Sequence, residues 1–285
     1  MRSTLVRLSA LTTLPLISSC HAIALGALHA AGPVAEAQRH LYFMLAIVLV
    51  FVAGPVLLLT PLIAWHYRLS NKDNAFQTKW HFSWWLEGLI WVPPTGIVIG
   101  LSVLLWDYTH RLDPYRPIAG AQPPLEIQAI ALDWKWLFIY PDQHIASVNQ
   151  LAIPVGRPVR ISLTSGTVMQ AMLIPRLAGQ IYAMAGMRTQ LNLAASAPGI
   201  YRGANVQYNG TGFARQKFAV IALPPAGYRR WLDRVHAADH PLDQAAFARL
   251  FARSTPPQPI FYSTVPAGLF DTILSRDASS MEMKR

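Results

Sequence analysis

The loop IYRGANVQYNGTG, residues 200–212, combines amide side chains at alternating positions with a glycine-rich end. Asn205, Gln207 and Asn209 are its amides, and a β-rich run precedes it. Loops that join two late strands of a small β domain often hold copper, which binds best to thiolate and imidazole side chains. This loop contains no Cys, His or Met. Its side chains therefore cannot supply copper ligands.

Glu87 is a second residue that could do chemistry, because it is the one charged residue in the apolar run 84–106. An ionisable group inside a membrane span is by default a functional hypothesis. The alternative is structural, since a carboxylate in the first turn of a helix is favoured by the helix dipole. The residue types alone leave the two interpretations equally open.

The composition predicts membrane spans together with one exposed domain. The chain has 285 residues, 53% of them hydrophobic and 13% charged, with nine Trp. A soluble domain carries about 25% charged residues. Cys20 is the single cysteine, which excludes an internal disulfide and any site that needs two thiolates.

Residues 1–19 are expected to be a lipoprotein signal peptide. Arg2 and Arg7 precede the apolar run LSALTTLPLI, and ISSC places small residues directly before Cys20. In bacterial lipoproteins such a signal is cut before the cysteine, whose thiol is then lipidated. The alternative is cleavage after Ala24, which would discard Cys20. Either route delivers the mature N-terminus across the inner membrane.

Two apolar runs, 41–65 and 84–106, are long enough to cross a bilayer. They contain 25 and 23 residues, and a membrane core needs about 20 in a helix. Pro55 and the PPTG sequence at 93–96 predict kinks, which neighbouring helices make tolerable. The loop between the runs has a net charge of +2, as expected of a cytoplasmic loop. The chain after about residue 108 is then exported.

The exported region reads as a β domain followed by helices. Five short β-rich runs are bounded by turn-forming residues: PLEIQAIAL, WKWLFIYP, SVNQLAIP, RPVRISLTS and KFAVIALP. Many short strands at regular spacing predict a sandwich or barrel. From residue 226 the apolar residues recur three and four apart, as in amphipathic helices.

Three long motifs resemble the matching stretches of subunit II of bo-type ubiquinol oxidases, in the haem–copper respiratory oxidase superfamily. They are ALDWKWLFIYPDQ, VMQAMLIPRLAGQIYAMAGM and YNGTGF. The resemblance runs from the cysteine of the signal to the C-terminal helices. It implies a two-helix transmembrane hairpin, then a cupredoxin-like Greek-key β-sandwich, then short C-terminal helices.

The resemblance also implies where copper ligands would lie. Cytochrome c oxidases of this superfamily carry a binuclear copper centre in this domain, held by His, Cys, Met and a Glu backbone. Those positions fall here on residues that leave every side-chain ligand vacant: Gln170, Asn205, Gln207, Asn209, Phe213 and Gln216. Because the exported domain contains no Cys, a bridged copper pair cannot form. The loop then has the structural role of closing the sandwich.

Charge is a second discriminator between electron donors. Residues 111–285 contain 18 Lys and Arg against 10 Asp and Glu, a net charge of +8. Cytochrome c is usually basic, so a basic domain would repel it, whereas a lipid-soluble quinol is indifferent. The simpler interpretations are solubility and attraction to anionic lipid.

The family resemblance assigns roles to three further residues. It places Glu87 at the mouth of a proton channel on the cytoplasmic side. In the copper-bearing relatives, aromatic residues in the stretch of Trp134 and Trp136 lie near the point of electron entry, so electron transfer is the alternative role. With no copper to reduce, packing or subunit contact is the expected role, and strand alternation would place both on one face.

We therefore expect subunit II of a proton-pumping terminal ubiquinol oxidase, acting as a non-catalytic auxiliary subunit. The chain itself would bind no cofactor or metal. Haems and one copper would belong to subunit I, and ubiquinol would be the substrate of the complex. The alternatives are a cytochrome c oxidase subunit and a free membrane-anchored lipoprotein that acts as a binding or assembly module.

The expected partners are subunit I, further small membrane subunits and membrane lipid, without nucleic acid or cytochrome c. The expected location is the bacterial inner membrane, multi-pass, with the large C-terminal domain in the periplasm. The expected segments are a signal peptide, an exported N-terminal segment, the hairpin, a linker, the cupredoxin-like domain and a helical region: 1–19, 20–40, 41–107, 108–121, 122–223 and 224–285.

Overall fold

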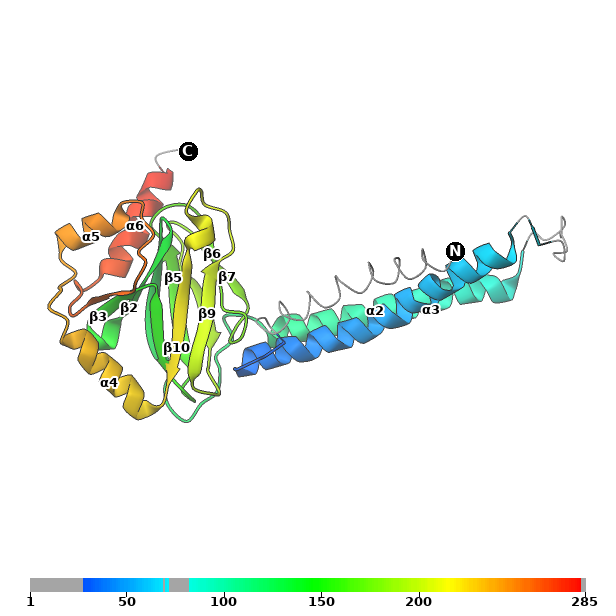
Figure 1. Ribbon diagram of the computed structural model, residues 1–285, viewed down its shortest axis with the longest axis horizontal. Helices are drawn as coiled ribbons and strands as arrows, with labels where there is room; N and C mark the ends of the chain where they lie inside the picture. The colour runs from blue at the N-terminus through cyan, green and yellow to red at the C-terminus, as the bar shows by residue number, and fades with distance from the viewer. Residues whose placement is uncertain (1–27, 69, 72–81, 283–285) are drawn as a thin grey trace, which may run out of the picture. The chain divides into compact units, whose positions relative to one another are not determined.

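The computed structural model describes residues 28–68, 70–71 and 82–282 (Figure 1). Cys20 and the expected signal peptide lie outside the described residues, so their assignments stay predictions. The chain divides into two compact units. One comprises Met1–Arg39 with Pro114–Arg285, and the other comprises His40–Asp113.

Two long apolar helices account for the second unit. Helix α2 spans Pro33–His66 and α3 spans Trp84–Arg111, and both pass the length and composition test for a membrane span. At 1.5 Å per residue they are roughly 51 and 42 Å long, which exceeds a bilayer core of about 30 Å. Helix α2 begins eight residues before the apolar run 41–65. That extra part is polar enough to lie outside hydrocarbon, since it carries Glu36.

The segment just before α2 is tied to the β domain. The Ala31 amide donates to the Arg176 carbonyl at 2.8 Å, and the Ala31 carbonyl accepts from the Ser196 amide at 2.7 Å. At Gly32 a Cβ would lie 2.2 Å from the carbonyl oxygen of Ala194, so only glycine fits there. The chain therefore departs into α2 from the surface of the β domain.

The β domain is a sandwich of two sheets. The first has the strand order β11-β3-β2-β1-β5-β8, and the second has the order β4-β10-β9-β6-β7. The strands are β1 Leu125–Leu132, β2 Lys135–Tyr140, β3 Ile145–Val148, β4 Gln150–Pro154, β5 Val159–Ser165, β6 Gln170–Leu173, β7 Gln180–Ala183, β8 Thr189–Leu193, β9 Gly199–Asn205, β10 Lys217–Leu223 and β11 Ile260–Tyr262.

The strand pairing gives the sandwich its Greek-key character. Strands β1 and β5 run parallel, as do β4 and β10, while their other neighbours are antiparallel. Large side chains from both sheets meet in the core, where the Phe218 ring lies 5.2 Å from Phe138 and 6.0 Å from Trp136. The cupredoxin-like fold class is confirmed.

Three helices follow β10: α4 Pro225–His236, α5 Gln244–Phe251 and α6 Leu269–Glu282. Helices α5 and α6 lie against the β2 and β3 side of the first sheet (Figure 1), where a second apolar core forms. The region 224–285 was expected to be helical. It is helical only in part, because it also contains β11, which pairs with β3. Its three residues follow a proline-rich connector and are too few to show a strand period.

Lys135 fixes α5 to the sandwich from inside. Its side chain is fully buried, and Nζ donates to the carbonyls of Leu250 at 2.9 Å and Ala252 at 2.6 Å. A cation at a helix C-terminus is favoured by the helix dipole. Burial lowers the pKa of the Lys135 amine, an effect that the nearby Asp133 carboxylate partly opposes.

Tyr228 on α4 predicts a stability loss at alkaline pH. Burial raises the pKa of its phenol from 10.0 to about 12. The unfolded chain therefore loses this proton first, so stability is intact below pH 10 and falls as pH rises through 12, by about 2–3 kcal/mol. The buried Tyr228 hydroxyl has no hydrogen-bond partner among the described residues. Tyr228→Phe should match or exceed the wild type at pH 8.

Denaturant unfolding of the detergent-purified chain, followed by tryptophan fluorescence at pH 8 and pH 11.5, checks this expectation. The Tyr228→Phe chain should lose less stability between the two pH values than the wild type. Equal losses in both chains would show that this phenol does not carry the alkaline sensitivity.

Candidate functional site

Amide side chains from three separate segments meet at one end of the sandwich. Gln170 begins β6, Asn205 ends β9, and Gln216 directly precedes β10. All three are almost completely buried, at 0%, 4% and 1% exposure. Asn209 joins them from the loop between β9 and β10. We call these four residues the amide network.

Gln216 is the centre of the amide network. Its Oε1 accepts from Asn205 Nδ2 at 3.0 Å and from Asn209 Nδ2 at 2.7 Å. Its Nε2 donates to Gln170 Oε1 at 2.5 Å. One side chain thus binds the other three members, because a primary amide both donates and accepts.

The backbone completes the amide network. Asn205 Oδ1 accepts from the amides of Ala171 and Gln207, both at 3.0 Å. Gln170 Nε2 donates to the carbonyl of Leu132 at 3.2 Å, at the end of β1. The network therefore joins β6, β9 and β1, and it closes the end of the sandwich as the loop was expected to do.

Two of the six predicted copper-ligand positions, Gln207 and Phe213, do not contribute their side chains to the amide network. Gln207 contributes its backbone amide and carbonyl to Asn205. Phe213 begins the short helix η2 Phe213–Arg215, and its ring lies 5.7 Å from the ring of Tyr208. The Leu132 carbonyl could not be predicted as a partner, because every residue has a backbone carbonyl and the sequence does not distinguish those that accept from side chains.

Trp134 explains the glycines of the loop. It lies in the turn between β1 and β2 with φ +66°, and its Nε1 donates to the Asn209 carbonyl at 3.2 Å. At Gly212 a Cβ would lie 2.1 Å from the Trp134 ring, so the indole packs directly on glycine backbone. The expectation that Trp134 and Trp136 share a strand face is wrong, because Trp134 belongs to the turn.

Trp136, in β2, has no exposed surface. Its ring lies 6.0 Å from that of Phe218, and its Nε1 has no hydrogen-bond partner in the described part of the chain. Of the two roles expected for it, the geometry favours packing, since a side chain without exposure cannot touch another subunit.

Gly212→Ala should destabilise the loop by about 1–3 kcal/mol, because the added methyl displaces the Trp134 ring. The Trp134–Asn209 hydrogen bond would be lost with it. Thermal unfolding of the purified protein measures the effect. In a protein that already carries Trp134→Leu, Gly212→Ala should lower the stability much less. Equal stability losses with and without Trp134 would contradict the packing of the indole on Gly212.

The donor set of the amide network does not fit a copper pair. A bridged pair needs thiolates, with imidazole beside them. Here three of the side-chain oxygens already accept hydrogen bonds from amide groups of the chain. Among the described residues no group of three or more His, Cys, Asp or Glu could hold a metal ion.

Glu87 lies in the first turn of α3, four residues after Ser83, whose carbonyl accepts from the Glu87 amide. Its carboxylate accepts from Trp91 Nε1 at 3.0 Å, one turn further along the helix. The side chain is half-buried. Trp91 thus orients a carboxylate at the start of a membrane-length helix. The spacing of four residues was the one feature of the sequence that could have predicted this pairing.

Two helices long and apolar enough to span a membrane precede a cupredoxin-like β-sandwich, which is the architecture of a membrane-anchored protein. No family model matches the chain. It is 40% identical to ubiquinol oxidase subunit 2 of Acetobacter aceti, over 98% of this chain and 90% of that protein. It is 39% identical to cytochrome bo(3) ubiquinol oxidase subunit 2 of Pseudomonas aeruginosa, over 86% and 74% of the two chains.

The chain belongs to the subunit 2 family of ubiquinol oxidases. Among solved structures, the periplasmic domain of subunit II of cytochrome oxidase from Bradyrhizobium japonicum is similar, with a TM-score of 0.38 and 21% identity. That likeness covers 41% of this chain and 96% of that domain. The predicted ubiquinol oxidase subunit is confirmed over both alternatives.

Proposed function

We propose that the chain is the non-redox subunit 2 of a proton-pumping complex that oxidises ubiquinol and reduces dioxygen to water. In this proposal it binds no redox metal. Haems and the copper of the oxygen site belong to subunit I, which receives electrons from ubiquinol directly. Subunit 2 braces subunit I and supplies a proton-collecting carboxylate.

The amide network is the observation that carries the proposal. A redox copper pair would have to replace four amide side chains that bind one another and the backbone at 2.5–3.2 Å. Amides neither gain nor lose electrons under biological conditions. The end of the sandwich is thus held by hydrogen bonds, and electrons have no carrier there.

Surface charge supports quinol over a protein electron donor. The exported residues 111–285 carry a net charge of +8. Such a field slows the approach of a basic cytochrome c and leaves a neutral quinol unaffected.

The anchoring of Ala31 supports a two-pass arrangement. The chain leaves the β domain at Pro33 and rejoins it at Pro114, with α2 and α3 between them. Two points on one domain lie on one side of a membrane, so an even number of crossings must separate them. This is consistent with a bacterial inner membrane protein whose β domain is periplasmic.

Apolar side chains next to the amide network offer a surface for subunit I. Met169 directly precedes Gln170, Val206 directly follows Asn205, and Tyr208 directly precedes Asn209. All three are exposed, Tyr208 at 72%. Clustered exposed apolar side chains favour a protein interface, so we assign this end of the sandwich to contact with subunit I.

Oxygen uptake by the purified complex tests the proposal. Ubiquinol should drive rapid oxygen consumption, whereas reduced cytochrome c should drive none above background. Comparable rates with both donors would overturn it. Gentle detergent extraction supplies a second check, because a free lipoprotein module would purify without haem-bearing partners.

A further inference from the structure

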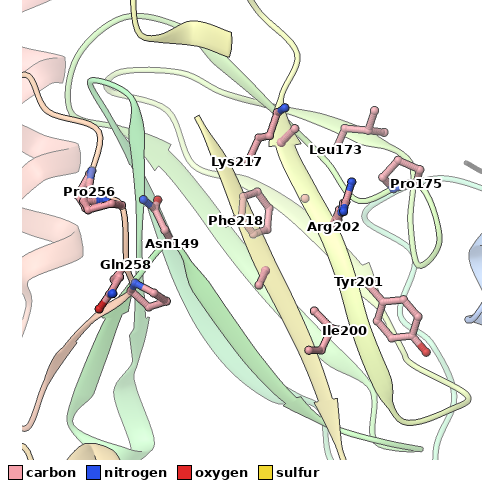
Figure 2. Close-up of a pocket in the computed structure, with 15 residues that line it drawn as sticks. Asn149, Leu173, Pro175, Ile200, Tyr201, Arg202, Lys217, Phe218, Pro256 and Gln258 are labelled. Atoms are coloured by element: carbon pink, nitrogen blue, oxygen red, sulfur yellow. The ribbon is translucent and has the colours of Figure 1, made fainter. Parts of the chain in front are cut away.

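A groove with two basic residues lies on the second sheet, and none of the amide network residues lines it. Its volume is about 590 Å³, and it is lined by strands β9 and β10, by Leu173 and Pro175, and by the proline-rich segment 256–259 (Figure 2). Figure 2 shows Pro256 and Gln258 on one side, opposite Leu173 and Pro175. None of its lining residues is acidic.

Two basic side chains on the floor of this groove have no acidic partner among the described residues. Arg202 on β9 and Lys217 on β10 are both exposed, and neither makes an ion pair or a side-chain hydrogen bond with any described residue. Lys217 is opposite Ala204 in the ladder, so Arg202 is its diagonal neighbour. Diagonal neighbours lie about 7–8 Å apart. Like charges at that spacing repel each other, and an anion between them would relieve the repulsion.

The rest of the groove is apolar. Ile200, 71% exposed, projects from the same face of β9 as Arg202, since the two are separated by one residue. Three prolines, at 256, 257 and 259, form the opposite wall. An occupant must therefore combine negative charge with apolar side chains.

The edge of β10 favours an extended polypeptide. The ladder between β4 and β10 begins at the pair of Gln150 and Ala219, so Lys217 and Phe218 have no partner in β4. Of these two residues, Lys217 directs its backbone groups to this edge, because those of Gln216 and Phe218 face β9. An uncovered strand edge offers backbone groups that another chain can pair with. In an extended segment, alternate side chains lie about 7 Å apart on one face, which matches the spacing of the two cations.

We propose that this groove docks an acidic, partly apolar segment of an exported partner protein in an extended conformation. Carboxylates two residues apart bind Arg202 and Lys217, and the apolar side chains that alternate with them lie on the other face of the segment, where they contact the proline wall. This docking role goes beyond the oxidase function, and it rests on the proposed function only for the periplasmic location of the β domain.

The test uses the intact oxidase complex in phosphatidylcholine nanodiscs. The probe is a capped, fluorescent octapeptide of alternating glutamate and leucine, and its counterpart carries glutamine for glutamate. The acidic peptide should bind about threefold to tenfold more tightly than the glutamine peptide, which is the size of effect expected of two exposed ion pairs. A photo-crosslinker on the acidic peptide should label the groove, at Ile200 or the segment 256–259.

Charge reversal locates the site. The double variant Arg202→Glu, Lys217→Glu should weaken binding of the acidic peptide by about tenfold or more. The matched control is Arg229→Glu, Arg230→Glu on the exposed face of α4, which changes net charge equally. It should leave affinity within about twofold, because screening limits distant charges. The variant Arg202→Gln, Lys217→Gln removes both charges without reversing them. A thermal melt of each complex checks that every variant is folded.

Three results with the peptides would overturn the proposal, and a fourth with lipid would do so as well. One is no preference between the two peptides, and another is an equal loss of binding in the control variant. The third is labelling outside the groove. If short-chain phosphatidylglycerol binds through Arg202 and Lys217 and the acidic peptide does not, the groove is a lipid headgroup site and the proposal fails.

Discussion

Glu87→Ala should slow ubiquinol-driven turnover by about tenfold, a rise of about 1.4 kcal/mol in the limiting barrier. The carboxylate is the one charged group in the run 84–106, and Trp91 holds it at the start of α3. An uncharged methyl can neither attract a proton nor pass it on. Oxygen uptake and proton uptake by the complex, measured in parallel, should fall together.

The control for Glu87 lies in the same helix. Asp107 is the other carboxylate of α3, near its opposite end, where it pairs with Arg111. Asp107→Ala should leave turnover within about twofold of wild type, since exposed ion pairs contribute little. Glu87→Asp, which retains the carboxylate, should recover part of the rate. Full turnover and proton uptake in the Glu87→Ala complex would remove the assignment.

Gln216→Leu should lower the free energy of unfolding by about 3–5 kcal/mol. The change removes the three hydrogen bonds to the other amides and two longer ones to the carbonyls of Leu132 and Lys135. It leaves polar atoms of Gln170 and Asn209 buried without these partners. Each buried polar group that loses its hydrogen bond lowers the free energy of unfolding by about 1–3 kcal/mol. In a connected network the total loss exceeds the sum of the single losses. Denaturant unfolding of the detergent-purified chain measures the loss.

Gln207 provides the matched comparison, because its backbone alone binds Asn205. Gln207→Ala should cost less than about 1 kcal/mol, as half-exposed substitutions usually do. If Gln216→Leu proves as mild as Gln207→Ala, the amide network does not hold the end of the sandwich.

The sequence predicted the architecture well because membrane spans and strands leave strong local patterns. The two apolar runs became α2 and α3, and the five β-rich runs correspond to β1, β2, β3 with β4, β5 and β10. The first helix began earlier than expected, at Pro33, because its polar start has no hydropathy signal. Strand β11 was missed for a similar reason, since its pairing with β3 is non-local.

The residues of the site were predicted from the sequence, but the hydrogen bonds among them were not. Laying the copper-ligand positions on this sequence selected Gln170, Asn205, Asn209 and Gln216, and the fold brings these four together. That amides would bind one another could not be read from spacing, because they come from segments up to 46 residues apart. The role of Trp134 was also hidden, since a tryptophan in a turn with positive φ breaks the strand period.

The spectrum that most directly tests the central claim is the electron paramagnetic resonance spectrum of the purified complex after incubation with excess copper. No signal of a mixed-valence copper pair should arise, because amides occupy the positions of its ligands. Such a signal, if it were traced to this polypeptide, would contradict the account and would route electrons through the sandwich.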